Sequence, residues 1–378
     1  MSLDIQLITD KIEFIINIRE KSVKKIGPLQ LGLSFAGCFL GAGYVSGQEL
    51  WQFFGSFGAK GFWGLALTML LLYAVGVVMI RLNQETGLSE VDKLIVRRDI
   101  SAVRIAVCAL ELVFLFGVST IMAAGVGALM NQLFGIPTWI GCALFTVLVA
   151  VISLAGLQGM VKAFSVSVPI LVGVTFLFGV TALVQNGMPE IPRGLSGSNP
   201  LMGSWFIAAI SFACYNVFGS IAMVAPLGEF TKEKKTAFGG IAVGTLMLVI
   251  IALSVLISVC AEEAVIDAEL PMLALASAKA PYLGIVYGIL LLLAMFGTSL
   301  SSLVAFTNML CLKSERINSN KLWLVVVYAL GMFFGSLFGF GELISVIYPL
   351  FGYCSSVFIV LMVIHFIKVK KTKKAEIS

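Results

Sequence analysis

Long apolar runs joined by short polar connections follow one another along the chain from residue 28 onward. A membrane-spanning helix needs about 20 consecutive, mostly apolar residues. The pattern predicts ten such helices, over residues 28–56, 61–82, 102–131, 138–155, 160–184, 201–229, 237–260, 282–311, 322–340 and 342–367. The polar segment before them contains no apolar stretch followed by a cleavage site, so we do not expect a cleaved signal peptide.

The composition agrees with a membrane protein. Of the 378 residues, 59% are hydrophobic and only 12% are charged, whereas about 25% are charged in an ordinary soluble domain. This leaves too little polar surface for a soluble protein, a nucleic-acid-binding protein or a disordered chain. The 7 cysteines stand singly in apolar runs and there is 1 histidine, so we expect no metal cluster and no cofactor. Without a nucleophile–base pair, an enzyme is the weakest functional class. The predicted fold class is all-α integral membrane.

The basic residues predict how the chain lies in the bilayer. Ten spans put both termini on one side, and 22 of the 25 lysines and arginines then fall on that side. Cytoplasmic connections carry the excess of Lys and Arg. We therefore expect a multi-pass protein of the cytoplasmic membrane with both termini in the cytoplasm, and the net charge of +5 implies no acidic partner. The sequence does not indicate an oligomeric state.

The ten spans divide into two halves of five. The expected organisation is a cytoplasmic N-terminal tail, a first five-helix repeat, an extracytoplasmic loop, a second five-helix repeat and a basic cytoplasmic tail. Their boundaries are residues 1–26, 27–184, 185–200, 201–367 and 368–378. The connection over residues 261–281 is acidic and then moderately apolar, which predicts either a short helix over an outer vestibule or an ordinary structured loop.

Two spans contain segments that disfavour a continuous helix. The first has four glycines between Gly37 and Gly47, and each lowers helix propensity by about 1 kcal/mol. The sixth has Cys214 to Ser220, with Pro226 close behind. Close packing of helices through small residues is the alternative explanation for the first cluster. Broken helices at matching places in two halves, however, indicate a transporter site at the interface of an inverted repeat.

Hydroxyl and acidic side chains suggest the chemistry of such a site. In the eighth span Thr298, Ser301 and Ser302 share one helical face, where they can bind a small cation or form ordinary hydrogen bonds within the membrane. Glu49 and Glu111 are ionisable residues inside spans and are candidates for proton coupling or for facing a substrate amine. A structural hydrogen bond between helices is the alternative for both.

Aromatic and polar residues near the breaks are candidates for a solute pocket. They are Tyr44, Tyr215, Asn216 and Phe218. Tyr215 and Asn216 are preferred because both lie inside the second expected break, and an asparagine amide offers a donor and an acceptor.

At these residues the chain resembles the amino acid–polyamine–organocation superfamily, which has the leucine transporter fold, and within it the YkvI-type membrane proteins. The motif is Ala36-Gly37-Cys38-Phe39-Leu40-Gly41-Ala42-Gly43. The resemblance covers nearly all of residues 28–367. It implies a ten-helix inverted repeat, a substrate carboxylate on the amides of Ala42 and Gly43, and one sodium ion. That ion would be held by the carbonyls of Gly37 and Leu40 and the hydroxyls of Ser301 and Ser302.

The chain also departs from sodium-coupled members of that superfamily. Tyr44 stands where they have an asparagine that helps to hold a second sodium ion, and Gly47 stands where they have a gating arginine. The outer gate must therefore be built differently.

We expect a secondary active transporter that moves a small polar solute, an amino acid or a related amine or carboxylate, by alternating access. Sodium is favoured over the proton as the coupling ion. A transporter fold used as a sensor or scaffold without transport is the alternative. A channel is a further alternative, although nothing in the sequence resembles a repeated selectivity filter.

Overall fold

The computed structural model describes residues 26–96, 100–155, 161–186, 199–231, 233–311 and 319–377. These residues are almost entirely helical, and no strand occurs among them. The N-terminal tail up to residue 25 and most of the connection over residues 185–200 lie outside the described residues, so the predictions for them stay predictions.

Ten apolar helical regions fall on the ten predicted spans. Six helices are long and apolar enough to cross a membrane: α5 (Ala59–Thr86), α7 (Ser101–Phe134), α10 (Trp205–Val224), α12 (Lys234–Cys260), α14 (Pro281–Cys311) and α17 (Phe340–Ile377). The other four regions lie in α2 (Pro28–Phe39), α8 (Thr138–Ala155), α9 (Val161–Asn186) and α16 (Lys321–Ser336). Their apolar helical stretches are shorter, over Pro28–Phe39, Thr138–Leu154, Val172–Gln185 and Lys321–Ser336. The expectation of an all-α integral membrane fold is confirmed.

Short helices and turns complete the chain between these regions. They are α3 (Ala42–Ser46), α4 (Gln48–Phe53), η1 (Gly55–Phe57), α6 (Val91–Ile95), η2 (Pro200–Met202), α11 (Leu227–Phe230), η3 (Glu263–Val265) and α13 (Pro271–Lys279). The connection over residues 261–281 thus contains a short helix, α13, which packs against α14.

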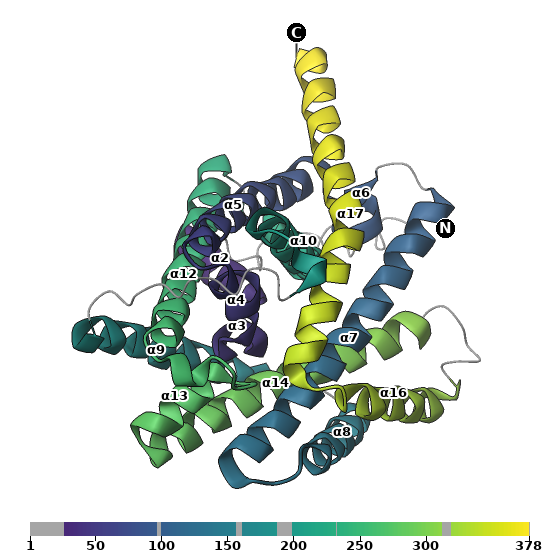
Figure 1. The fold of residues 1–378 in the computed structure, drawn as a ribbon. Helices are drawn as coiled ribbons and strands as arrows, with labels where there is room; N and C mark the ends of the chain where they lie inside the picture. The colour runs from purple at the N-terminus through teal and green to yellow at the C-terminus, as the bar shows by residue number, and fades with distance from the viewer. Residues whose placement is uncertain are drawn as a thin grey trace.

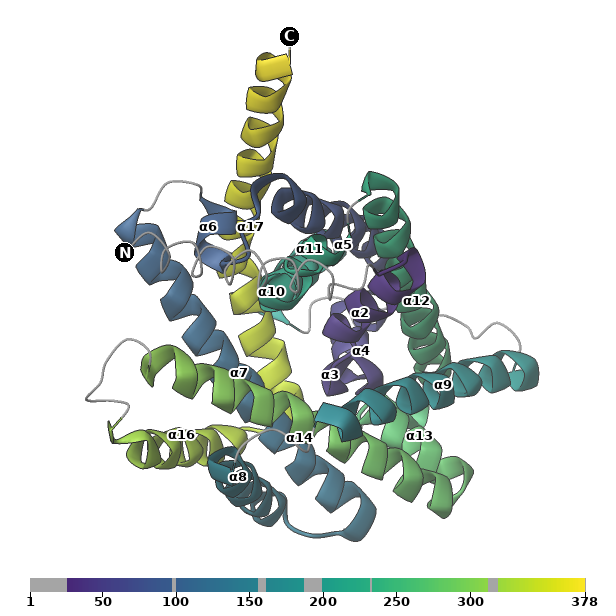
Figure 2. The same cartoon turned by 180° about the vertical axis from the view of Figure 1, so that it is seen from behind.

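The packing of the helices repeats when the two halves are exchanged. Helix α2, the first of the first half, packs on α12, the second of the second half. In the same way α10, the first of the second half, packs on α5, the second of the first half. The contact of α9 with α14 has its counterpart in the contact of α17 with α7, while α7 on α14 and α8 on α16 join equivalent helices. Figures 1 and 2 show α2, α3, α4 and α10 in the interior of this arrangement. These pairings are what a five-plus-five inverted repeat requires.

The first span is broken in the middle. Helix α2 ends at Phe39, and Leu40 and Gly41 are not helical. The N–H of Gly41 donates to the Phe39 oxygen at 2.9 Å, which leaves the ordinary helical pattern. A second interruption lies at Gly47, whose φ of 89° is accessible mainly to glycine. Between the two interruptions, α3 keeps helical form.

The predicted break over residues 214–220 is wrong in position. These residues are regular helix within α10, and the sixth span is interrupted only after Val224, at Ala225 and Pro226. Proline has no N–H to donate and disrupts a helix interior. Pro226 therefore interrupts the helix, whereas the polar and small residues between Cys214 and Ser220 do not.

The basic C-terminal tail meets the end of α5. The basic tail continues α17, and Lys373 Nζ lies 2.6 Å from Glu85 Oε2 at the end of α5. Arg81 pairs with the same carboxylate. The C-terminal tail is therefore a helical extension rather than an irregular tail (Figure 1).

Candidate functional site

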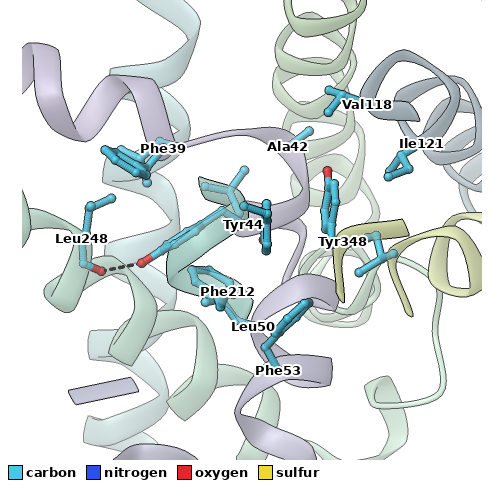
Figure 3. Packing of buried hydrophobic residues seen from close by; sticks show 14 of the residues in the cluster. Phe39, Ala42, Tyr44, Leu50, Phe53, Val118, Ile121, Phe212, Leu248 and Tyr348 are labelled. Atoms are coloured by element: carbon cyan, nitrogen blue, oxygen red, sulfur yellow. Dashed lines mark hydrogen bonds between the residues drawn. The ribbon is translucent and has the colours of Figure 1, made fainter. Parts of the chain in front are cut away.

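The short helix α3, just after the break, is fixed by hydrogen bonds to two other spans. The Tyr44 hydroxyl donates to the Leu248 carbonyl oxygen of α12 at 2.8 Å, as the dashed line in Figure 3 shows. The Tyr287 hydroxyl of α14 donates to the Val45 oxygen at 2.6 Å and lies 3.0 Å from the Thr175 hydroxyl of α9. The broken segment therefore has a defined position. Tyr44 is 1% exposed and acts as an anchor rather than an open pocket wall.

Two carbonyl oxygens and two N–H groups at the break have no partner within the described part of the chain. No donor there reaches the carbonyl oxygens of Gly37 and Leu40, because the N–H groups of Gly41 and Tyr44 donate elsewhere. The amides of Ala42 and Gly43 likewise find no acceptor among the described residues. A Cβ atom added at Gly37 or Gly41 would meet nothing within 4 Å. Unpaired polar backbone groups beside open space are what a binding site in a broken helix needs.

The hydroxyl groups of α14 that the sequence singled out differ in their hydrogen bonding. The Thr298 hydroxyl donates to the Ala294 oxygen one turn earlier at 3.0 Å, the ordinary pattern for threonine in a membrane helix. The hydroxyls of Ser301 and Ser302 make no hydrogen bond with any described residue. Ser301 is exposed and Ser302 is 6% exposed. Helix α14 packs against α3, and the hydrogen bond that joins them is at Tyr287, about 21 Å along the helix from Ser301.

A buried carboxylate connects the two broken spans. Glu49, in the first turn of α4, is 5% exposed and accepts a hydrogen bond from the Tyr215 hydroxyl of α10. The Asn216 side chain lies beside the same carboxylate, and its Nδ2 donates to the Phe212 oxygen at 3.0 Å. One carboxylate oxygen of Glu49 occupies the space where a Cβ of Gly43 would be. The fold thus brings Gly43, Glu49, Tyr215 and Asn216 together.

Tyr348 of α17 belongs to the same cluster, and sequence reasoning missed it. Its ring stacks on that of Tyr215 with centroids 4.5 Å apart and an angle of 12°. Its hydroxyl makes no hydrogen bond with a described residue, and Figure 3 shows it directed toward the space between Ala42 and Val118. A tyrosine directly before Pro349, inside an apolar span, was the available signal.

Two predicted residues lie away from this cluster. Phe218, one turn after Tyr215, packs against Phe114 and Phe358 at centroid distances of 6.4 and 5.9 Å. Glu111 is half-buried on α7, two turns, or about 10 Å along the helix, before Val118.

The chain is similar in sequence to two membrane proteins of Bacillus subtilis (strain 168). It is 25% identical to the uncharacterized membrane protein YkvI over 336 residues, which covers 87% of this chain and 93% of YkvI. It is also 25% identical to the uncharacterized protein YyaD over 325 residues, with 85% and 91% of the two chains covered. No protein-family model matches the chain.

Solved transporter structures share its fold. The inward-facing conformation of Mhp1 aligns with a TM-score of 0.62 at 16% identity, covering 89% of this chain and 76% of Mhp1. Mhp1, a nucleobase-cation-symport-1 family transporter, in a closed conformation with bromovinylhydantoin bound aligns with a TM-score of 0.54 at 14% identity, covering 87% and 75%. A manganese transporter of Eremococcus coleocola aligns with a TM-score of 0.50 at 13% identity, covering 88% and 74%. At these identities the likeness concerns the fold.

Proposed function

We propose that the chain is a secondary active transporter that carries a small polar solute across the cytoplasmic membrane by alternating access. The observation that carries the proposal is the break at Leu40 and Gly41. It leaves unpaired backbone groups beside open space, and it faces groups of the second half of the chain. An interrupted helix in a bilayer costs several kcal/mol unless its free groups are used. A solute and its coupling ion would use them.

The solute site would lie between the broken first span and α10. The amides of Ala42 and Gly43, together with Tyr44, Tyr215, Asn216 and Phe218, were the expected contributors. Tyr215 and Asn216 gain support from their contact with Glu49. For Tyr44 and Phe218 the contacts favour packing, so we assign them to the support of the site rather than to its surface.

Sodium is the coupling ion that we favour. Hard oxygen ligands suit a small cation. Those expected here are the carbonyls of Gly37 and Leu40 and the hydroxyls of Ser301 and Ser302, none of which has a partner among the described residues. Thr298 can add a further oxygen, although its proton is engaged. If transport proves to be driven by protons, Glu49 and Glu111 are the groups that would carry the coupling.

The test combines binding and flux with the purified protein. A solute panel of amino acids, amines and carboxylates is screened by thermal stabilisation in sodium and in potassium buffer, since a ligand of the native state stabilises it by RT ln(1 + [L]/Kd). Flux of the stabilising solutes is then followed in proteoliposomes. Binding without any flux would support the sensor or scaffold alternative.

The variant Ser302→Ala tests the ion site. The sodium concentration needed for half-maximal solute binding should rise by about tenfold or more, because the variant removes one of few ligands, while the protein stays folded. Ser299→Ala is the matched control, since Ser299 lies on the same helix, is 0% exposed and faces the Met332 sulfur at 3.6 Å. Equal sodium dependence in the two variants and the unmodified chain would remove this ion assignment.

A further inference from the structure

Glu49 is a buried acid without a basic partner. Its carboxylate is surrounded by Tyr215, Asn216 and the backbone at Gly43. Among the described residues, no Lys, Arg or His nitrogen lies within 4.0 Å of it. Buried charges in proteins are normally paired. The partner that this carboxylate lacks within the described chain can be supplied by a bound molecule.

The surroundings of the carboxylate are aromatic. The Tyr215 ring lies 5.7 Å from Phe53, 5.4 Å from Phe212 and 4.5 Å from Tyr348, measured between ring centroids. Aromatic faces carry partial negative charge and attract cations. A carboxylate next to such rings therefore favours a positively charged group and repels a second carboxylate.

The acceptor groups around Glu49 suit an ammonium group better than a transition-metal ion. Transition metals in proteins take several carboxylate, imidazole or thiolate ligands, and no group of three such residues that could hold a metal occurs in the described part of the chain. An ammonium group has three N–H donors. Glu49 offers a carboxylate, and the Tyr348 hydroxyl, which has no described partner, offers an additional acceptor.

We propose that Glu49 is the counter-charge for an ammonium group of the solute. The site then takes amine-bearing solutes and rejects solutes whose only charge is a carboxylate. This inference rests on the proposed function, because it takes the amine to belong to the transported solute bound next to the break at Leu40 and Gly41. It narrows the expected class from amines or carboxylates to molecules that carry an amine.

Three probes with one shared aromatic body test the charge preference. Phenethylamine, 2-phenylethanol and 3-phenylpropanoate differ in the charge of their end group, and each is titrated into the purified full chain in potassium buffer by thermal stabilisation. We expect stabilisation by phenethylamine at concentrations at least about tenfold lower than by either analogue, because a charge-assisted hydrogen bond is lost in the other two.

Glu49→Gln removes the charge and keeps the size of the side chain. It should weaken phenethylamine binding by about 10- to 100-fold and leave 2-phenylethanol binding unchanged. Glu342→Gln is the matched control, because Glu342 is an exposed carboxylate in the first turn of α17. That variant should bind all three probes as the unmodified chain does.

Three outcomes would overturn the counter-charge. Phenethylamine fails to stabilise the protein, the three probes stabilise it equally, or phenethylamine binding survives Glu49→Gln. Stabilisation by sodium that disappears in Glu49→Gln would assign the carboxylate to the ion instead. If Glu49→Gln does not fold, the probe comparison on the unmodified chain and on Glu49→Asp decides, with Glu49→Asp expected to keep the preference for the amine.

Flux measurements separate this inference from the proposed function. Amine binding that depends on Glu49, without flux of any amine in proteoliposomes, would overturn transport and keep the counter-charge. Flux of neutral or anionic solutes that is indifferent to Glu49→Gln would keep transport and overturn the counter-charge.

Discussion

The two sides of the break in the first span are packed very differently. On the α4 side Leu50, Phe53 and Phe54 are all 0% exposed. On the α2 side Leu33 is 51% exposed, and a Cβ atom at Gly37 would meet nothing within 4 Å. One half-helix is enclosed by protein, whereas the other is covered mainly by α12 along one face.

Hydrogen bonds reinforce the enclosure of the α4 side. Gln52 Nε2 donates to the Gly341 oxygen at 2.9 Å. The Glu269 carboxylate, before α13, accepts from the N–H groups of Phe340 and Gly341 at 2.7 and 3.2 Å. These contacts join α4, the connection around α13 and the start of α17. In the proposed transporter they would form the closure at the place where Gly47 stands instead of a gating arginine.

Leu31 and Phe35 of α2 are buried against α12, so the difference concerns the other face of α2. If the chain alternates access as proposed, this difference fits a conformation that is closed on the α4 side and open on the α2 side. In a two-state transporter such closure is a matter of relative free energy, so changes on either side should shift the population of the two states. Substitutions on the two sides should therefore differ in their effects on stability and on accessibility.

Gly47→Val should have the largest effect. Its φ of 89° is unfavourable for a β-branched residue, and a Cβ there would lie 3.1 Å from Met272 Cγ and 3.3 Å from Val259 Cγ2. We expect a loss of about 2–4 kcal/mol in the free energy of unfolding, seen as a lower thermal midpoint in detergent. Gly41→Ala, on the open side, should change the midpoint little. An equal fall for both variants would contradict the contrast.

Glu269→Gln should shift the closure rather than unfold the chain. Replacing a charge-assisted acceptor by a neutral one should weaken the link to the start of α17 by about 1–2 kcal/mol. The α4-side-closed state loses population, so labelling of Ser301→Cys in a cysteine-free background should become slower, by less than about tenfold, because 1–2 kcal/mol changes the ratio of two states more than it changes the population of the favoured one. Glu262→Gln is the control, an exposed acid in the same connection. Unchanged labelling in Glu269→Gln would argue against the closure.

Tyr287→Phe should have the smallest effect on stability, about 1 kcal/mol, because it removes only the hydrogen bonds that the hydroxyl forms with the Val45 oxygen and the Thr175 hydroxyl. It should nevertheless weaken solute and sodium binding, since α3 loses an anchor. Tyr328→Phe is the control, since it removes a comparable pair of hydrogen bonds away from the break, to the Ser119 hydroxyl at 2.6 Å and to the Leu115 oxygen at 3.1 Å. Binding that falls equally in both variants would show that the anchor has no specific role.

Much of the fold follows from patterns that local chemistry controls. The ten spans appear where the apolar runs predicted them, because a helix that must satisfy its own backbone in lipid needs only length and apolar side chains. The first break was also predictable, since Gly41 and Gly47 sit at its two interruptions. The second break was misplaced because polar residues remain helical when their side chains bond the preceding turn of the same helix, as Asn216 does to the Phe212 oxygen.

The membership of the site depends on contacts that sequence patterns do not contain. Glu49 could be recognised as an acid inside a span, but its closeness to Tyr215, some 166 positions later, comes from the packing of α4 on α10. Glu269 carried no signal that separated it from other acidic residues, and the signal at Tyr348, the proline directly after it, did not show which residues it would contact. Phe218 carried a misleading one, since its neighbours are the rings of Phe114 and Phe358.

The sequence by itself determined the number of spans, the division into two halves and the place of the first break, because apolar length and glycine act within one segment. Only the tertiary structure decided which groups at the break stay unpaired, which side of it is closed and which residues surround Glu49. Those properties depend on distances between helices that are far apart in the chain, and hydrogen bonds and aromatic contacts act only over a few ångströms.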